Sequence, residues 1–456
     1  MKYFFSCLFI ILAVASFSQA DDSLFIRRIA DEILVNGKAY DDLRVLTKQI
    51  GQRLSGSAGM YKAEQWGMQT MKAAGADNAW LQECMVPHWV RGGKDQGTAI
   101  YHNKGKTATK KLDVLALGNT VGTNKSLTAE VLEVKNFDEL EAKKNQINGK
   151  IVFYNYPFDE RFVRTFQAYS DAVKYRGQGP SRAARYGAKA VIVRSMSHST
   201  DNNPHTGSTS YNDSFPKIPA VAIGLRDADW LSNALQNGKV NVMLHTHGHF
   251  LPDTLGHNVI GEIRGSEFPN EYITIGGHLD SWDPGEGAHD DGAGMVQTIE
   301  ILRTFKTLGY KPKRTIRFVL FANEENGLRG GTKYAEEAKA KGEKHVFALE
   351  SDAGGFTPRG FGFGVSDDQF RKVLSWQNLL CPYGACELVK GGGGADIGPL
   401  ARTQNTPVAG LNPDSQRYFD IHHARNDVFE NVNKRELLLG AVNMAALVFL
   451  VDKYGL

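Results

Sequence analysis

Short apolar runs alternate with stretches of helical periodicity in the second half of the chain. The predicted order there is a strand ending at Gly276, a helix at about 292–308, a strand at 314–322, a helix at 329–341 and a strand at 345–350. Strands that alternate with helices of this length form a largely parallel sheet covered on both faces. We therefore predict an α/β fold with a mixed, largely parallel sheet and helices on both faces.

The first half of the chain has a different pattern. Residues 22–75 show helical periodicity, 80–118 hold short β-like runs, and 122–251 hold short strands separated by turns, with one helix in the middle. We interpret 122–251 as an inserted β-rich domain that divides a main domain into an N-terminal part, 21–121, and a C-terminal part, 252–456. The alternative, that 122–251 is more of the same sheet, stays open at this point.

Both ends of the chain are apolar. At the start, Lys2 precedes an apolar run from Tyr3 to Phe17 and the small residues Ser18 and Ala20, a pattern typical of a cleaved signal peptide at 1–20. It predicts a secreted, extracellular or lysosomal protein; an uncleaved anchor is the alternative. The helix expected at about 434–453 has an uninterrupted apolar run too short to span a bilayer, so we predict a core helix and no membrane span.

Composition and charge narrow the partners. The 456 residues are 42% hydrophobic and 23% charged, which suits two or three globular domains. A formal net charge of +3 without a long run of Lys or Arg gives no electrostatic surface for nucleic acid, so none is expected as a partner.

Cysteines and glycosylation motifs carry less information. Removal of the signal peptide would remove Cys7 and leave Cys84, Cys381 and Cys386. The last two are close enough in sequence to pair, and two free thiols are the alternative. Asn-X-Ser motifs at Asn124 and Asn212 are glycan acceptors if the host glycosylates.

Candidate chemistry gathers at the ends of the three predicted strands. His278 and Asp290 flank a Gly-rich loop after the first, Glu324 and Glu325 follow the second, and Asp352 follows the third. A sixth candidate, His423, lies in a polar loop before the last helix. Ligands of open α/β sheets bind at the carboxyl ends of the strands, so we expect these side chains to converge.

Nitrogen and oxygen donors without thiolate suit zinc in a catalytic site. Two imidazoles and three carboxylates exceed what one tetrahedral zinc can use, but they match two ions that share one carboxylate. Two zinc ions about 3.5–4 Å apart would acidify a bridging water and polarise a carbonyl. Consecutive residues beyond a strand end point in different directions, so we expect Glu325 to be a ligand and Glu324 a general base. Asp280 is expected to orient the His278 imidazole.

Each of these residues alone has a structural explanation, since Glu-Glu pairs are usually solvated and Asp-Asp-Gly often caps a helix. Their joint order is more specific. The segment GGHLDSWDPGEGAHDDGAG at 276–294, followed by NEENG, ESDAGG and HHARND, resembles the family of co-catalytic zinc exopeptidases. Further matching segments extend the resemblance over nearly the whole mature chain.

The resemblance implies a function and a role for each residue. His278, Glu325, Asp352 and His423 would be terminal ligands of two Zn²⁺ ions, with Asp290 between them and Glu324 as the general base. It also implies a cis peptide bond between Asp290 and Asp291, a protease-associated-like insert and a homodimer. The expected activity is hydrolysis of short peptides, mainly dipeptides with free termini, by metal-hydroxide attack.

Two positions depart from the family or match it weakly. Some relatives carry a tyrosine before the last ligand to stabilise the oxyanion, whereas this chain has His422, so either His422 or a group elsewhere, such as a partner subunit, donates that hydrogen bond. Asp396, in a segment that resembles a family pocket, is a candidate contact for a substrate terminus, and a solvated loop acid is the alternative.

Three questions stay open on the sequence. Aminopeptidase and carboxypeptidase polarity are not distinguished by the metal ligands. A single-zinc acyl transferase resembling the glutaminyl cyclases is one alternative function, and a receptor-like binding protein without catalysis is another.

Overall fold

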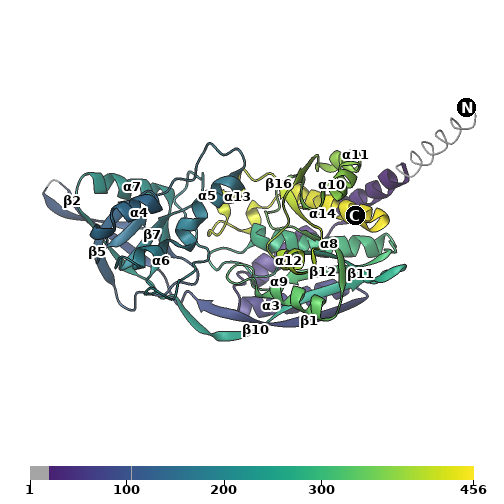
Figure 1. Cartoon of the computed structure of the whole chain (residues 1–456), viewed down its shortest axis with the longest axis horizontal. Coiled ribbons are helices and arrows are strands. Elements are labelled where there is room, and N and C mark those ends of the chain that lie inside the picture. Colours follow the sequence, from purple (N-terminus) through teal and green to yellow (C-terminus); the bar gives the residue numbers. More distant parts are fainter. Residues whose placement is uncertain (1–19, 104) are drawn as a thin grey trace, which may run out of the picture.

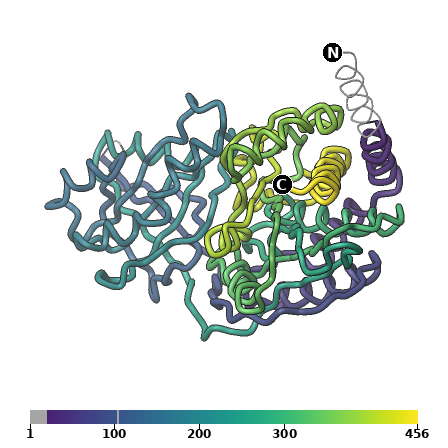
Figure 2. Tube along the Cα trace, turned by 45° about the vertical axis from the view of Figure 1, so that its right-hand side comes forward, coloured from purple at the N-terminus to yellow at the C-terminus, as the bar shows by residue number. Residues whose placement is uncertain are grey.

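The computed structural model describes residues 20–103 and 105–456 and shows two domains, each with its own sheet (Figures 1 and 2). Except for Ala20, the predicted signal peptide lies outside the described residues. Residues 20–36 form a helix beside the C-terminal helix, where Tyr454 donates a hydrogen bond to Asp22 (2.6 Å).

The first sheet has the strand order β1-β10-β12-β11-β13-β16-β14-β15. Its strands are β1 (Asn78–Val90), β10 (His249–Ile263), β11 (Phe268–His278), β12 (Arg314–Phe321), β13 (Lys344–Glu350), β14 (Pro358–Gly364), β15 (Glu387–Lys390) and β16 (Val408–Pro413). The central strands β12, β11, β13 and β16 run parallel, whereas β10 and β14 join them antiparallel. The predicted mixed, largely parallel sheet is confirmed.

Helices cover both faces of this sheet. They are α2 (Ala39–Val45), η1 (Leu46–Ile50), α3 (Ala58–Ala73), η3 (Ala288–Gly292), α8 (Ala293–Thr307), α9 (Arg329–Ala340), α10 (Asp367–Leu374), α11 (Gln377–Leu380), η4 (Cys381–Tyr383), α12 (Gly398–Gln404), α13 (Tyr418–Ile421), η5 (Phe429–Asn431) and α14 (Lys434–Tyr454). Strand β12 shows why two layers are needed, because its alternate residues are buried on opposite faces. Phe318 packs in the core under α8 and α14, and Val319 packs in the core under α9 and α12.

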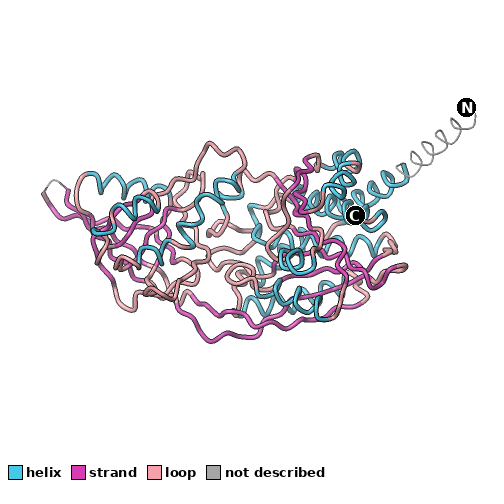
Figure 3. Tube along the Cα trace, viewed as in Figure 1, coloured by secondary structure: helices cyan, strands magenta, loops and turns pink. Residues whose placement is uncertain are grey.

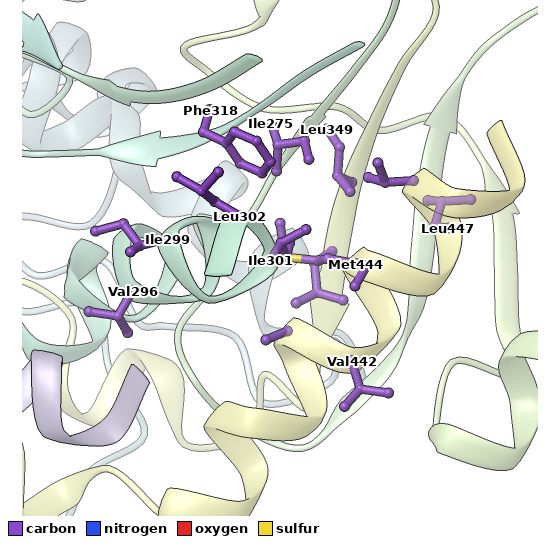
Figure 4. Packing of buried hydrophobic residues seen from close by; sticks show 14 of the residues in the cluster. Ile275, Val296, Ile299, Ile301, Leu302, Phe318, Leu349, Val442, Met444 and Leu447 are labelled. Atoms are coloured by element: carbon purple, nitrogen blue, oxygen red, sulfur yellow. The ribbon is translucent and has the colours of Figure 1, made fainter. Parts of the chain in front are cut away.

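The larger of these cores joins the three central strands to two helices. Ile275, Phe318 and Leu349 come from β11, β12 and β13 and face Leu302 of α8 and Met444 of α14 (Figure 4). Helix α14 is long and apolar enough to cross a membrane by length and composition, but 83% of its most apolar window is buried in the protein. It is therefore a core helix of this domain, as predicted.

The second sheet has the order β3-β2-β9-β5-β6-β7-β8-β4. Its elements are β2 (Gln96–Asn103), β3 (Lys106–Leu112), β4 (Val114–Ala116), β5 (Leu127–Val134), α4 (Phe137–Ala142), η2 (Lys144–Gln146), β6 (Ile151–Tyr154), α5 (Thr165–Gly177), α6 (Gly179–Ala184), β7 (Ala190–Arg194), β8 (Ala220–Ile223), α7 (Leu225–Gln236) and β9 (Val240–His245). Two hydrophobic clusters of its own fill the space between sheet and helices.

This arrangement corrects the predicted boundary at residue 122. Strands β2, β3 and β4 precede that residue, yet they belong to the second sheet, where β2 pairs with both β3 and β9, and β4 pairs with β8. The domain also holds several helices rather than one (Figure 3). The error has a physical cause. A short β-like run has the same sequence pattern in either sheet, so the sheet that it joins depends on the strand with which it pairs. For β2 and β4 that strand lies more than a hundred residues away.

Two further predictions meet the structure here. Cys381 and Cys386 form a disulfide, and Cys84 is a buried free thiol. Asn124 and Asn212 are both exposed, so their side chains are accessible. Glycosylation of these two residues stays a prediction.

Candidate metal centre

The predicted site residues converge at the carboxyl edge of the first sheet. His278 ends β11, Glu324 and Glu325 follow β12, and Asp352 follows β13. Asp290 lies in η3 before α8, and His423 follows α13 with a left-handed backbone (φ 60°). Parallel strands end at the same edge, so residues far apart in sequence meet there.

Asp290 lies between the two imidazoles. Its Oδ1 is 3.2 Å from Nε2 of His278, and its Oδ2 is 3.2 Å from Nε2 of His423. One carboxylate thus offers a separate oxygen to each side. This is the geometry expected of a carboxylate shared by two cations.

A second carboxylate accompanies each imidazole. Oδ1 of Asp352 lies 3.4 Å from Nε2 of His278, and Oε2 of Glu325 lies 3.1 Å from Nε2 of His423. The same nitrogen atoms therefore face one oxygen of Asp290 and one oxygen of a terminal carboxylate. The result is two matched sets of one nitrogen and two oxygens, a donor combination that suits a pair of zinc ions.

Burial makes this cluster costly without cations. It raises the pKa of Glu325 to about 7, and together with the charge of Asp290 it keeps that carboxyl partly protonated. Burial also raises the pKa of Asp352 and moves that of Glu324 well above its ordinary value. Oδ2 of Asp290 and Oε1 of Glu325 are buried oxygens that accept no hydrogen bond. Buried carboxylates are normally paired or bound to metal, so the residues fit the predicted ions.

The imidazoles respond in the opposite direction. For His423, the cost of burying a cation is outweighed by the negative charges of Glu325 and Asp290, and the pKa rises to about 10. For His278, burial is outweighed by Asp352 and its other acidic neighbours, and the pKa also rises. In the metal-free protein both rings thus carry a proton that a zinc ion would displace.

Asp280 contacts His278 mainly through its backbone oxygen, and its role in orienting that imidazole stays a prediction. Nδ1 of His278 lies 3.0 Å from the backbone oxygen of Asp280, whereas the nearest carboxylate oxygen of Asp280 is 3.7 Å away. The Asp280 carboxylate instead accepts hydrogen bonds from the backbone N–H groups of Glu324 (2.9 Å) and Glu325 (3.3 Å). Asp280 therefore contacts the imidazole through its main chain and the Glu324–Glu325 turn through its side chain.

Two more carboxylates hold the loop around Asp290, and neither has a role that was predicted from the sequence. Asp427 accepts the N–H groups of His289 (2.8 Å) and Asp290 (3.2 Å), and Asp291 accepts those of His278 (3.0 Å) and Gly294 (2.9 Å). The Asp290–Asp291 peptide bond is cis, as the resemblance implied. The spacing of Asp427 after His423 was the only sequence signal for the first contact.

The site opens into a cavity of about 470 Å³ between the two domains. Glu324 and His422 lie on its wall beside the candidate ligands. The ring of His422 stacks on that of His423 at 3.6 Å between centroids, and burial and the charge of His423 move the pKa of His422 well below its ordinary value. His422 is thus a neutral imidazole.

Asp396 is not among the residues that line this cavity. Its side chain is fully buried, so it is not a solvated loop acid, and its contact with a substrate terminus stays a prediction. Burial and the neighbouring Glu350 carboxylate raise the pKa of Asp396 well above its ordinary value. The Gly-rich sequence before Asp396 predicts an exposed loop, whereas in the structure Asp396 packs against Gly331 of α9.

A mixed α/β sheet that presents two imidazoles, three carboxylate donors and a further glutamate at its carboxyl edge defines a metallopeptidase scaffold. The chain belongs to peptidase family M28, whose model matches residues 258–448. It is 35% identical over 416 residues to carboxypeptidase Q of Mus musculus, covering 91% of this chain and 85% of the relative. Carboxypeptidase Q of Homo sapiens is 35% identical over 428 residues, covering 92% and 86%.

Solved structures give the same family and fold. A peptidase M28 precursor from Shewanella amazonensis SB2B superposes with a TM-score of 0.88 at 31% identity, covering 95% of this chain and 97% of that one. The aminopeptidase from Aneurinibacillus sp. strain AM-1 shares the fold at a TM-score of 0.63 and 22% identity, with 93% and 95% covered. The protein is therefore a metallopeptidase of the M28 family.

Proposed function

We propose that this metallopeptidase is a dizinc exopeptidase that hydrolyses short peptides, mainly dipeptides with free termini, as a carboxypeptidase or dipeptidase. The observation that supports it is the position of Asp290, whose two oxygens each face a different imidazole at 3.2 Å. We assign His278, Asp290 and Asp352 to one ion and His423, Asp290 and Glu325 to the other. When bound, the two zinc ions supply Lewis acidity that polarises the scissile carbonyl and acidifies water.

We assign Glu324 as the general base. Unlike Glu325, its carboxylate has no ion-pair partner among the described residues, and it faces the cavity. Its backbone N–H donates to the Asp280 carboxylate, which holds the turn that carries Glu324. A carboxyl whose pKa is raised by burial accepts a proton from water and returns it to the leaving amine near neutral pH.

We assign His422 as a candidate donor to the oxyanion. Its neutral ring lines the cavity, and its Nε2 lies 3.7 Å from Oδ2 of Asp290, which places it beside the metal ligands. An N–H aimed at the developing negative charge stabilises the transition state. A protonated imidazole is not needed for that role.

The decisive experiment combines zinc analysis with a panel of dipeptides that are free, blocked at the amino end or blocked at the carboxyl end. Two zinc ions per chain and cleavage of the free dipeptides are expected. One tight zinc without peptide cleavage would favour the cyclase-like alternative, and a metal-free chain that binds a protein would favour the receptor-like one.

The setting of the enzyme is also a proposal. We infer secretion or lysosomal targeting from the signal-like residues 1–20, and the Cys381–Cys386 disulfide fits an oxidising compartment. We further propose that the second domain is protease-associated-like and that the protein is a homodimer. Sizing by light scattering tests the homodimer.

A further inference from the structure

Arg176, near the end of α5 in the second domain, contributes a guanidinium to the wall of the metal-site cavity. It is the only Lys or Arg among the described residues that line this cavity, where the acidic side chains are Asp290, Glu324, Glu325 and Asp352. The residue is only 6% exposed. A buried cation on an otherwise acidic wall requires an explanation.

The guanidinium is incompletely paired. Nη1 donates to the backbone oxygen of Thr206 (3.3 Å), Nη2 donates to the hydroxyl of Tyr169 (2.7 Å), and Nε is buried without a partner. Within the described parts of the chain, no carboxylate lies within 4.0 Å of it. Of the five N–H donors of a guanidinium, the Nε–H and one Nη2–H thus have no acceptor among the described residues, and a buried charge without a counter-ion is costly.

Arg53 shows how a purely structural buried arginine looks in this protein. It is fully buried as well, but its nitrogens donate to the backbone oxygens of Gly51, Leu279, Glu286 and Gly287. It thereby supports the loop before Asp290. Arg176 has no such set of acceptors, so support of the chain does not account for it.

Position and packing hold Arg176 beside the metal centre. Its Nη1 lies 3.4 Å from Nδ1 of His423, and both groups contact the backbone oxygen of Thr206. A Cβ on Gly207 would come within 2.3 Å of the Arg176 Cζ, so only glycine leaves room for the guanidinium there. The guanidinium thus contacts the Nδ1 side of the His423 ring, whose opposite nitrogen, Nε2, faces Asp290 and Glu325 and would bind zinc.

We propose that Arg176 binds a carboxylate of the peptide substrate, in the first place the free C-terminal carboxylate. This inference rests on the proposed dizinc peptidase function. Two zinc ions would balance the four carboxylates of the cavity wall, which leaves the charge of Arg176 to attract an anion. An Arg–carboxylate pair is charge-assisted and can be bidentate, and a substrate ammonium would be repelled at the same position. The pair would give the enzyme carboxypeptidase polarity.

The test compares alanyl-alanine with alanyl-alanine amide on the zinc-loaded full-length protein. For the wild type we expect a higher kcat/KM for the free acid than for the amide. Arg176→Gln should lower this acid-to-amide ratio about 10- to 100-fold, mainly because the KM for the free acid rises. Arg176→Lys should retain part of it, because the charge remains. Arg182→Gln, an exposed arginine of α6 outside the cavity, is the matched control and should leave the preference unchanged.

Two further arms separate the explanations. Alanyl-glutamate with an amidated C-terminus carries its only carboxylate on the side chain. If the wild type cleaves it with the kcat/KM of the free acid alanyl-alanine, and Arg176→Gln does not, the group bound by Arg176 is a side-chain carboxylate. Calorimetry measures the binding of alanyl-alanine to the zinc-loaded Glu324→Gln protein, with and without the second change Arg176→Gln. Arg176→Gln should weaken this binding by the same factor by which it lowers the preference for the free acid.

Equal losses for acid and amide, or no loss of binding in the double variant, would overturn the assignment and leave Arg176 as a support for His423. Tyr169→Phe, which removes only the acceptor of Nη2, provides a milder variant if Arg176→Gln does not fold, and a smaller loss of acid preference is expected. Wild-type protein with two zinc ions that cleaves no peptide would instead refute the proposed function itself.

Discussion

Nε2 of His423 lies 3.2 Å from Oδ2 of Asp290, although one residue precedes α8 and the other follows α13. The contact spans the sheet edge and brings together two halves of a candidate dizinc centre. Three testable predictions concern this centre, and a fourth concerns the carboxyl group of Asp42 elsewhere in the fold.

Replacement of Glu324 by Gln should lower kcat by about 10²–10⁴-fold or more while zinc stays bound, because the proton acceptor is lost but no ligand is. Turnover of a free dipeptide and zinc content by atomic spectroscopy measure the two effects. Glu336→Gln, an exposed change on α9, is the control and should retain activity. Near-normal turnover in Glu324→Gln would remove the residue from the mechanism.

Asp290→Asn should impair both zinc sites, whereas Asp352→Asn should weaken mainly the His278 site and Glu325→Gln mainly the His423 site. The reason is that Asp290 faces both imidazoles and each terminal carboxylate faces only one. Zinc titration of each variant gives the stoichiometry. Equal, single-site losses in all three would contradict a shared carboxylate.

Zinc uptake near pH 7 should release protons, and zinc affinity should fall as the pH is lowered. His423, whose pKa is raised to about 10, is protonated at pH 7 in the metal-free protein, and Glu325, with a pKa of about 7, is partly so. Both must lose the proton to bind a cation. Calorimetric titrations in buffers of different ionisation enthalpy count these protons, and a release of none would contradict the assigned ligands.

Asp42→Asn should stabilise the fold at pH 8 but not at pH 4. Burial, with the nearby charges of Glu300 and Asp41, raises the pKa of Asp42 to about 6. A raised carboxyl pKa favours the folded state below the unfolded value near 3.9, and this advantage is lost as the pH rises through 6. Removing the charge should therefore gain about 1–2 kcal/mol in the free energy of unfolding at pH 8.

Urea unfolding at the two pH values measures this difference. Asp31→Asn, an exposed change in the preceding helix, should show little pH dependence in comparison. A gain of equal size at pH 4 and pH 8 would mean that Asn stabilises for a reason other than charge.

The sequence determined the central sheet and the candidate ligands. Three apolar runs of strand length lead to His278, Glu325 and Asp352. Because parallel strands of one sheet end at the same edge, this pattern predicts that the three side chains lie close together. Local pattern and residue chemistry were sufficient there. The core helix α14 was likewise predicted from its apolar run.

Only the tertiary structure decided which sheet β2, β3 and β4 join, that Asp396 is buried, that Asp280 contacts His278 through its main chain, and that Arg176 reaches the cavity from another domain. Apart from the contact between Asp280 and His278, each of these depends on a partner distant in sequence, and the Asp280 carboxylate is itself held by the distant Glu324. Strand pairing and burial are properties of the whole packed chain, and a local pattern carries no information about which distant segment will supply the partner.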